Sequence, residues 1–292
     1  MGPRISVVVN TLNEEKNLRY ALRSVKPWVD EIVIVDMHSE DRTVETGREY
    51  GARIFLHERV GFVEPARTFA VAQASGDWIL VLDADEVVPL PLSRRLREIA
   101  ETDEADVVVI SWVNYILGAP LGHTGWGPLQ DVHSRFFKRG HIVATSIVHR
   151  DFAPAHGARV LHIPYQPGLA IVHFNCLDVA DFLERVNRYT TVEAKQAREG
   201  AEEAGPWKAM LQAGKEFVRR YLIMRGYRDG WRGFYLSLFM AFYRIATASK
   251  ITELQQVGPR AAVEDAYRRE AERLLTFDVG LHLSTDTAVR ER

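Results

Sequence analysis

The chain has 292 residues, of which 47% are hydrophobic and 26% charged, an ordinary globular composition that excludes wholesale disorder. Its 37 basic and 39 acidic side chains give a formal net charge of −2, which argues against a dedicated nucleic-acid-binding protein, because such proteins are usually strongly basic. The single cysteine, Cys176, excludes a disulfide framework and a cysteine zinc cluster. Together with a first segment that lacks a signal-peptide pattern, it predicts a cytoplasmic protein.

The first third of the chain alternates short apolar runs with helical patterns. Apolar runs that lack polar alternation and are separated by helices are typical of a parallel sheet covered on both faces. We therefore expect an α/β fold with a mostly parallel, Rossmann-like central sheet. Strands are predicted at 5–9, 31–36, 53–57, 78–83 and 106–113, and helices at 14–25, between Ser39 and Gly51, at 64–74 and at 92–100.

The later sections differ in character. Residues 118–168 are rich in glycine, proline and histidine, with short β-like pieces at 134–138 and 142–148. Helices are predicted at 178–199, 207–224, 230–250 and 261–275, which divides the chain into an α/β domain over 1–177 and a helical region over 178–292. A membrane-spanning helix needs about 20 apolar residues, and the longest charge-free run of the helical region, 233–243, has eleven.

Two carboxylates, Asp83 and Asp85, come at the end of a predicted buried strand. Ligands of parallel sheets bind beyond the carboxyl ends of the strands, and oxygen ligands at this spacing suit Mg²⁺ or Mn²⁺ shared with a substrate diphosphate. The alternative is that these acids cap the helix that follows Pro89. Their position after an apolar strand in a strand–helix series favours the metal site.

The ends of the first two strands carry further polar residues. Asp36 closes the second strand, where its carboxylate could accept a hydrogen bond from a ribose hydroxyl or cap the next helix, and both interpretations stay open. The first loop, residues 10–15, lacks the G-x-G-x-x-G pattern of dinucleotide-binding folds and the lysine of a P-loop. A NAD-dependent enzyme and a P-loop ATPase are therefore disfavoured.

A combination of motifs runs through residues 4–175. It comprises Asn13-Glu14-Glu15, Val35-Asp36, Asp41-Arg42-Thr43, Gly61-Phe62, Glu64, Ala66-Arg67, Phe69-Ala70, the run from Gly76 to Glu86, Asn114-Tyr115, Trp126, Asp131, the run from Arg135 to Lys138, Val148-His149 and His173. This combination resembles family 2 glycosyltransferases of the GT-A fold, especially bacterial lipopolysaccharide-core and cell-envelope enzymes. The resemblance implies an inverting transferase that uses a nucleotide-activated sugar and a divalent metal, Mn²⁺ or Mg²⁺.

The resemblance also implies roles for individual residues. The nucleotide would be bound by the side chains of Thr11, Asn13, Glu14, Asp36, Arg67 and Asp83. Arg67 would reach the nucleotide or its diphosphate, and Asp83 would face the ribose or the metal. Asp85 would ligate the metal, and His173 could complete the metal shell beside the diphosphate oxygens.

The general base is expected among carboxylates of the middle section. Inversion by single displacement needs a carboxylate that takes the proton of the acceptor hydroxyl while the metal stabilises the leaving diphosphate. Asp131 is the first candidate, because it lies within a matching motif, Asp151 is the second, and Glu86 is a third. The alternative for each is a loop carboxylate paired with a local arginine, Arg135 or Arg150.

The segment from Trp207 to Lys250 is basic and aromatic, with nine Lys or Arg, two acidic residues and ten aromatic residues. Such helices can lie at a membrane interface, with aromatic rings at headgroup depth and cations on anionic lipid phosphates. The same chemistry would suit a lipid-linked acceptor. The alternative is a helical pair whose aromatic stripe packs on the first domain.

The sequence as a whole predicts a glycosyltransferase with a GT-A domain and a helical C-terminal extension. The donor would be a UDP-, GDP- or dTDP-sugar, and the acceptor an envelope glycan or a lipid-linked sugar. Two other interpretations are a nucleotidyltransferase of similar fold and a non-catalytic module that binds sugar nucleotides or lipids.

Overall fold

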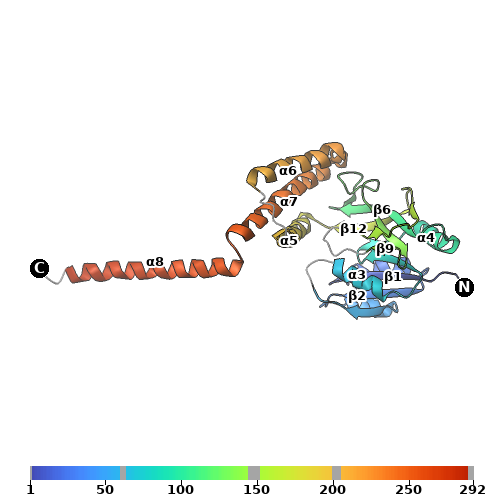
Figure 1. The fold of residues 1–292 in the computed structure, drawn as a ribbon, viewed down its shortest axis with the longest axis horizontal. Coiled ribbons are helices and arrows are strands. Elements are labelled where there is room, and N and C mark those ends of the chain that lie inside the picture. The colour runs from blue at the N-terminus through green and yellow to red at the C-terminus, as the bar shows by residue number, and fades with distance from the viewer. Residues whose placement is uncertain (1, 60–63, 144–151, 199–204, 289–292) are drawn as a thin grey trace.

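A computed structural model of the chain describes residues 2–59, 64–143, 152–198 and 205–288 (Figure 1). The α/β part contains strands β1 (Ile5–Thr11), β2 (Glu31–Asp36), β3 (Arg53–Leu56), β4 (Trp78–Asp83), β5 (Glu86–Val87), β6 (Val107–Ile116), β7 (Ala119–Pro120), β8 (Val132–Lys138), β9 (Ile142–Val143), β10 (Ala153–Pro154), β11 (Val160–His162) and β12 (Ala170–Cys176). Its helices are α1 (Leu18–Val25), α2 (Thr43–Glu49), α3 (Glu64–Gln73) and α4 (Leu90–Thr102). The helical part contains α5 (Val179–Arg198), α6 (Pro206–Val218), a π-helical turn η1 (Arg219–Ile223), a 3₁₀ turn η2 (Gly226–Asp229), α7 (Gly230–Gln256) and α8 (Arg260–Ala288).

The central sheet is mixed, with the strand order β3-β2-β1-β4-β8-β6-β12-β5. The first four of these strands are parallel, as the sequence predicts. β8 enters between β4 and β6 and runs antiparallel to both. The sheet is thus mostly parallel, as predicted, but a strand from the middle section, and not a strand–helix unit, lies between β4 and β6.

Two apolar layers cover the two faces of the sheet, as predicted. Alternation along β8 sends Phe136 into the layer under α1 and α4 and Phe137 into the layer under α3, and both rings are fully buried. Helix α1 contributes Leu18 and Leu22 to the first layer at helical spacing. This packing fixes the carboxyl ends of β1, β4 and β6 along one edge, which is where polar residues collect.

The helical part packs on the α/β part through a third apolar cluster. Ile116 of β6 and Cys176 of β12 meet Phe182 of α5 and Leu236 of α7 in this cluster. The change from strands to helices falls between β12 and α5, and the division of the chain into two domains at this boundary, near Leu177, stays a prediction. Residues from both sides of this boundary thus share one core.

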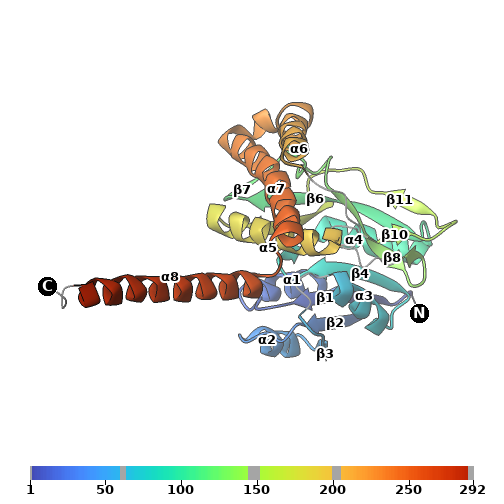
Figure 2. The same ribbon diagram turned by 60° about the vertical axis from the view of Figure 1, so that its left-hand side comes forward.

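The helices differ in how much of their surface is covered. α6 and α7 lie side by side, and α5 packs against α7. α8 extends away from the rest of the molecule as a single straight helix (Figures 1 and 2). None of the helices that the structure describes is long and apolar enough to cross a membrane.

Candidate functional site

A cavity of about 960 Å³ lies at the carboxyl ends of the central strands, between the sheet and the C-terminal helices. Parallel pairing of β1 with β4 places Asn10 directly beside Asp83 at its rim. Asn10 is 7% exposed, and within the described ranges neither polar atom of its side chain has a hydrogen-bond partner. A buried amide without partners is costly unless a ligand completes its hydrogen bonds, so Asn10 marks this end of the cavity as a binding site.

Asp83 is held in place by arginines. Nη2 of Arg67, from α3, lies 2.6 and 2.5 Å from the two carboxylate oxygens, and Nη2 of Arg135, from β8, lies 3.5 Å from Oδ2. Burial alone would raise the pKa of Asp83, but the two guanidinium groups hold it well below its usual range. Asp83 therefore stays ionised, and Arg67 lines the cavity, where its contact with a nucleotide stays a prediction.

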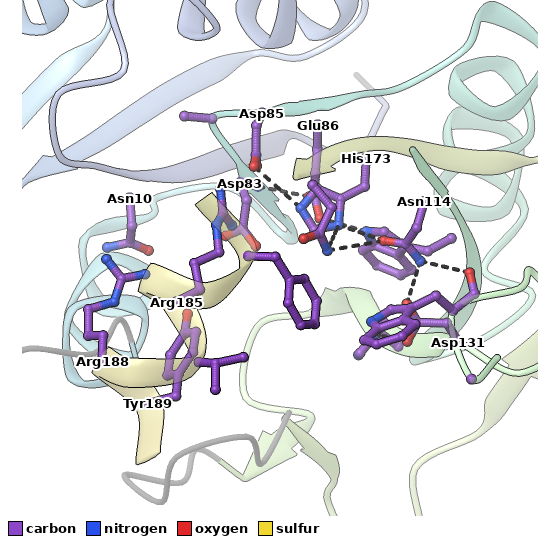
Figure 3. Close-up of a pocket in the computed structure, with 18 of the residues that line it drawn as sticks. Asn10, Asp83, Asp85, Glu86, Asn114, Asp131, His173, Arg185, Arg188 and Tyr189 are labelled. Atoms are coloured by element: carbon purple, nitrogen blue, oxygen red, sulfur yellow. Dashed lines mark hydrogen bonds and ion pairs between the residues drawn. The ribbon is translucent and has the colours of Figure 1, made fainter. Parts of the chain in front are cut away.

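Asp85 and His173 approach each other one step further along the wall. The short strand β5 pairs antiparallel with β12, so that Glu86 of β5 lies opposite His173 of β12. This pairing brings Nε2 of His173 within 3.4 Å of Oδ2 of Asp85 (Figure 3). Burial alone would lower the pKa of His173, but its contact with Asp85 raises it. Two of the three predicted metal ligands thus meet.

The third predicted metal ligand, Asp83, is turned to Arg67. Within the described part of the chain, no group of three His, Cys, Asp or Glu side chains is arranged to hold a metal ion. Mg²⁺ and Mn²⁺ are often held by one or two protein side chains together with substrate phosphates, and not by a complete protein cage. A carboxylate and an imidazole in contact fit that mode of binding.

A hydrogen-bond chain leads from His173 to Asp131. The fully buried Asn114 accepts a hydrogen bond from Nδ1 of His173 at 2.9 Å and donates from Nδ2 to Oδ2 of Asp131 at 2.7 Å. Nε2 of His133 lies 2.8 Å from the other oxygen of Asp131. Burial alone would raise the pKa of Asp131, but the contacts with His133 and Asn114 lower it. The first candidate for the general base is therefore an oriented, ionised carboxylate that lines the cavity.

Glu86 is a further carboxylate of this wall, and it has a structural role. Its oxygens accept hydrogen bonds from Nε1 of Trp112 at 2.5 Å and from the backbone amide of Asp83 at 2.8 Å. Burial, followed by repulsion from Asp83, raises its pKa. Glu86 thus fixes the turn that presents Asp83 and Asp85.

The predicted nucleoside-binding residues lie in two loops that hydrogen-bond to each other. Asp36 is buried and accepts hydrogen bonds from Oγ1 of Thr11 at 2.8 Å and from the amide and hydroxyl of Ser39 at 2.8 and 2.6 Å. Oδ1 of Asn13 accepts from the amide of Glu40 at 2.8 Å. Neither Thr11, Asn13 nor Asp36 lines the cavity as the structure describes it. Their contact with a nucleoside stays a prediction.

Glu14 does line the cavity. Its amide is anchored by Oγ1 of Thr43 at 2.7 Å, which fixes the first turn of the loop. Burial, with a smaller contribution from the charges of Asp85 and Asp83, raises the pKa of its carboxyl group to about 7. Glu14 can therefore change its protonation state near neutral pH.

The opposite wall comes from helices to which the sequence analysis assigned no role in the site. Arg185, Arg188 and Tyr189 of α5 line the cavity, and Figure 3 shows both arginines extending toward the side where Asn10, Asp83 and Asp85 lie. They share a helix face with the buried Phe182, since residues three and four apart lie one above the other. The sequence pattern that could have identified them is the occurrence of arginine and tyrosine at positions three and four residues from an apolar residue on the same helix face.

The second candidate for the base, Asp151, lies outside the described residues, as does the motif Val148-His149. The remaining predicted site residues are all described. Asp83, Asp85, Arg67, Asp131, His173 and Glu14 are brought together around one cavity.

A mixed α/β sheet with a D-x-D sequence after a central strand and a polar cavity at the strand ends is the arrangement expected of a GT-A glycosyltransferase. The sequence profile described as glycosyl transferase family 2 matches residues 6–157, more than half of the chain, and the chain belongs to this family. The protein is thus a glycosyltransferase, and the predicted fold class, a GT-A domain with C-terminal helices, is confirmed.

Relatives align over most of the chain. The lipopolysaccharide core biosynthesis glycosyltransferase LpsC of Rhizobium meliloti is 27% identical over 269 residues, covering 90% of this chain and 97% of its own. An uncharacterized glycosyltransferase of Rickettsia typhi is 24% identical over 278 residues, covering 90% and 92%. Among solved structures, residues 1–349 of TarS of S. aureus superpose with a TM-score of 0.44 at 16% identity, covering 87% of this chain and 91% of that one.

Proposed function

We propose that this glycosyltransferase transfers a sugar, with inversion, from a UDP-, GDP- or dTDP-sugar to a hydroxyl group of a cell-envelope glycan or lipid-linked acceptor at the inner face of the cell membrane. The observation that carries the proposal is the gathering of Asp85, His173, Arg67 and Asp131 around one cavity. The alignment with LpsC, which is named for lipopolysaccharide core synthesis, supports an envelope acceptor.

A divalent metal, Mn²⁺ or Mg²⁺, would be bound by Asp85 and His173, with Asp83 nearby. When bound, it would supply positive charge that stabilises the leaving diphosphate. Arg67 would bind and orient the same diphosphate, since a guanidinium donates two parallel hydrogen bonds to phosphate oxygens. The side-chain amide of Asn10 would form hydrogen bonds with the sugar nucleotide. Thr11, Asn13, Glu14 and Asp36 would shape the subsite for its nucleoside.

Asp131 would take the proton of the acceptor hydroxyl as the new glycosidic bond forms. Its two oxygens are oriented by Asn114 and His133, and its lowered pKa leaves it ionised at neutral pH and able to accept the proton. Asp151 remains the second candidate for this role.

Donor binding provides the direct test. Nucleotide sugars with UDP, GDP and dTDP are screened by thermal shift with and without Mn²⁺, and hits are assayed for nucleoside diphosphate and for inorganic pyrophosphate. We expect metal-dependent stabilisation and release of nucleoside diphosphate, with Asp85→Ala losing the metal-dependent part. The control Asp265→Ala removes an exposed carboxylate on α8, remote from the cavity lining.

Three outcomes contradict the proposal in different ways. Pyrophosphate chemistry in place of nucleoside diphosphate release would indicate a nucleotidyltransferase. Donor binding without any turnover would indicate a binding module. Stabilisation by metal that Asp85→Ala leaves unchanged would contradict the metal site alone.

We also propose that the hairpin of α6 and α7 contacts an anionic membrane. Ring-to-ring contacts join Phe217, Tyr221, Phe234, Tyr235 and Trp231 into one continuous aromatic surface across α6, η1 and α7. Exposed apolar side chains on the same hairpin include Trp207, Met210, Leu211, Leu222, Ile223, Tyr227, Leu238 and Phe242. Exposed basic residues Lys215, Arg225 and Arg228 accompany them, a combination that suits aromatic insertion at headgroup depth beside anionic lipid.

A further inference from the structure

Three arginines surround one buried carboxylate at the junction of α6, η1 and α7. Glu216 is 6% exposed, and its oxygens lie 2.6 Å from Nη2 of Arg219, 2.6 Å from Nε of Arg220 and 3.8 Å from Nη2 of Arg244. Burial alone would raise the pKa of Glu216, but hydrogen bonds from Arg219 and Arg220 lower it to about 2. The carboxylate is therefore ionised, and this group, which we call the Glu216 cluster, carries one negative and three positive charges.

Two members of the Glu216 cluster, Arg220 and Arg244, line the cavity of the active site. The guanidinium of Arg220 stacks on the ring of Trp126 at 4.5 Å and donates to the carbonyl of Thr124 at 2.7 Å, so its position is fixed. The side chain of Arg244 is 43% exposed and is bound only loosely to Glu216. One anchored and one adaptable arginine thus present positive charge to the cavity.

Contacts through Trp126 and Asn114 connect the Glu216 cluster to the proposed base. The ring of Trp126 contacts Arg220, and the carbonyl of Trp126 accepts a hydrogen bond at 3.0 Å from Asn114, the residue that orients Asp131. The acceptor hydroxyl must reach Asp131, so the part of the acceptor next to that hydroxyl comes close to these arginines. The donor diphosphate is expected at the other wall, with Asp85 and Arg67.

Positive charges crowded into a partly buried site favour an anionic ligand. Burial lowers the pKa of Arg220; the contact with Glu216 opposes this shift in part, and repulsion from Arg219 and Arg244 adds to it. A phosphate or carboxylate group placed between Arg220 and Arg244 would compensate that charge through charge-assisted hydrogen bonds. We propose that the acceptor is anionic and that Arg244, with Arg220, binds its phosphate or carboxylate group; this proposal rests on the proposed transferase function.

The test uses inorganic phosphate as the probe and the full-length protein. Thermal shift is measured against phosphate concentration at constant ionic strength, once in the free protein and once with saturating Mn²⁺ and the nucleoside diphosphate (UDP, GDP or dTDP) that binds in the donor screen. We expect a phosphate-dependent rise in melting temperature in both conditions. Arg244→Gln should raise the half-saturating phosphate concentration by about tenfold, and Arg244→Lys should restore part of the affinity.

Arg94→Gln is the matched control, because it removes an exposed arginine of α4 that does not line the cavity. Arg244 is half exposed, so its replacement is expected to leave the fold intact, unlike a replacement of Arg220. The proposal is overturned if wild type shows no phosphate-dependent shift, or if Arg244→Gln keeps the full shift. It is also overturned if nucleoside diphosphate abolishes the shift, since the anion would then be the donor's. None of these phosphate measurements needs turnover. Failure of the transferase proposal would appear in a different assay, as the absence of nucleoside diphosphate release, so the two failures can be told apart.

Discussion

At the scale of single residues, Asp131 shows how the fold prepares one side chain for proton transfer. One oxygen is engaged by Asn114 and the other by His133. We expect Asp131→Asn to reduce sugar transfer and donor hydrolysis by at least about 100-fold, because the amide cannot accept the proton. Donor affinity, measured by calorimetric titration, should change less than about twofold, since the amide is nearly isosteric.

His133→Gln serves as the comparison for Asp131→Asn. It removes an orienting contact but leaves the carboxylate, so its loss of turnover should be clearly smaller. Turnover of Asp131→Asn at the wild-type rate would eliminate Asp131 as the base and leave Asp151 as the candidate.

A second residue-scale prediction concerns acid stability and Glu31 at the start of β2. Burial alone would raise its pKa, but hydrogen bonds from Ser6, Ser75 and Arg53 lower it to about 2. A carboxyl group whose pKa is lower in the folded than in the unfolded state stabilises the fold above the unfolded value, near 4.5, and loses that contribution as the pH falls toward 2. We therefore expect the ionised carboxylate of Glu31 to stabilise the fold at neutral pH.

Glu31→Gln should therefore lower the free energy of unfolding at pH 7 and make it less sensitive to pH between 4.5 and 2. Urea denaturation at several pH values measures both effects. Glu272→Gln, on the exposed surface of α8, should change neither. If the free energies of unfolding of wild type and Glu31→Gln fell equally steeply with decreasing pH, the hydrogen bonds of Glu31 would not persist in solution.

Residue types and their order along the chain predicted that several polar residues gather at one edge of the sheet, and the structure places them around one cavity. Asp83 and Asp85 follow a buried strand, and β-strand geometry alone places them at the edge where ligands bind. The arginines of α5 could not be predicted in the same way. Arg185 and Arg188 reach the cavity only because α5 packs against the sheet, and a lone sequence does not specify the partner of an amphipathic helix.

At the scale of elements, β8 shows that a strand can be predicted from the sequence while its pairing partners in the sheet cannot. The run from Ser134 to Lys138 was predicted as a β-like piece, and the structure has a strand from Val132 to Lys138. Its alternation of buried rings specifies two faces, but pairing partners depend on which strands present open edges. The insertion between β4 and β6 also carries Arg135 and His133 to the cavity, so the same topological step that was missed builds part of the site.

The attachment of the helical part to the sheet gives the element-scale prediction. Leu236 of α7 is fully buried in the cluster that joins α7 to β6 and α5. Leu236→Ala should lower the free energy of unfolding by about 3 kcal/mol, because the cavity that it leaves can close only in part. Chemical denaturation measures this change.

Leu238→Ala is the matched control, because it truncates another leucine of α7, two residues further along the helix, whose side chain is 45% exposed. Its effect should stay below about 1 kcal/mol. Equal losses for the two variants would mean that α7 is not anchored through Leu236.

At the scale of the whole molecule, the net charge of −2 is a sum over regions of opposite character. Carboxylates collect at the strand ends around Asp83 and Asp85, whereas the hairpin of α6 and α7 is basic and aromatic. Near-neutrality therefore argues against a nucleic-acid-binding protein, but it does not argue against a local contact with an anionic surface.

The hairpin surface gives the prediction at this scale. Each basic side chain near an anionic bilayer contributes about 1 kcal/mol, and aromatic rings anchor at headgroup depth. The protein should therefore co-sediment with vesicles of phosphatidylglycerol and phosphatidylcholine at low salt, and much less with phosphatidylcholine alone or at high salt. Arg228→Gln should weaken binding by about fivefold, and Trp231→Ala should weaken it even at high salt, because its contribution is apolar.

The control for the vesicle experiment is Tyr267→Ala, which removes a ring of 74% exposure from α8, outside the hairpin. It should bind vesicles as wild type does, because Tyr267 lies outside the hairpin and the arginines near it on α8 are paired with acidic side chains, such as Arg268 with Asp265. Failure of the wild-type protein to sediment with anionic vesicles at low salt would remove the membrane contact. The aromatic surface would then have to be covered by another protein or by a second copy of this chain, because contiguous exposed apolar surface of this kind marks an interaction site.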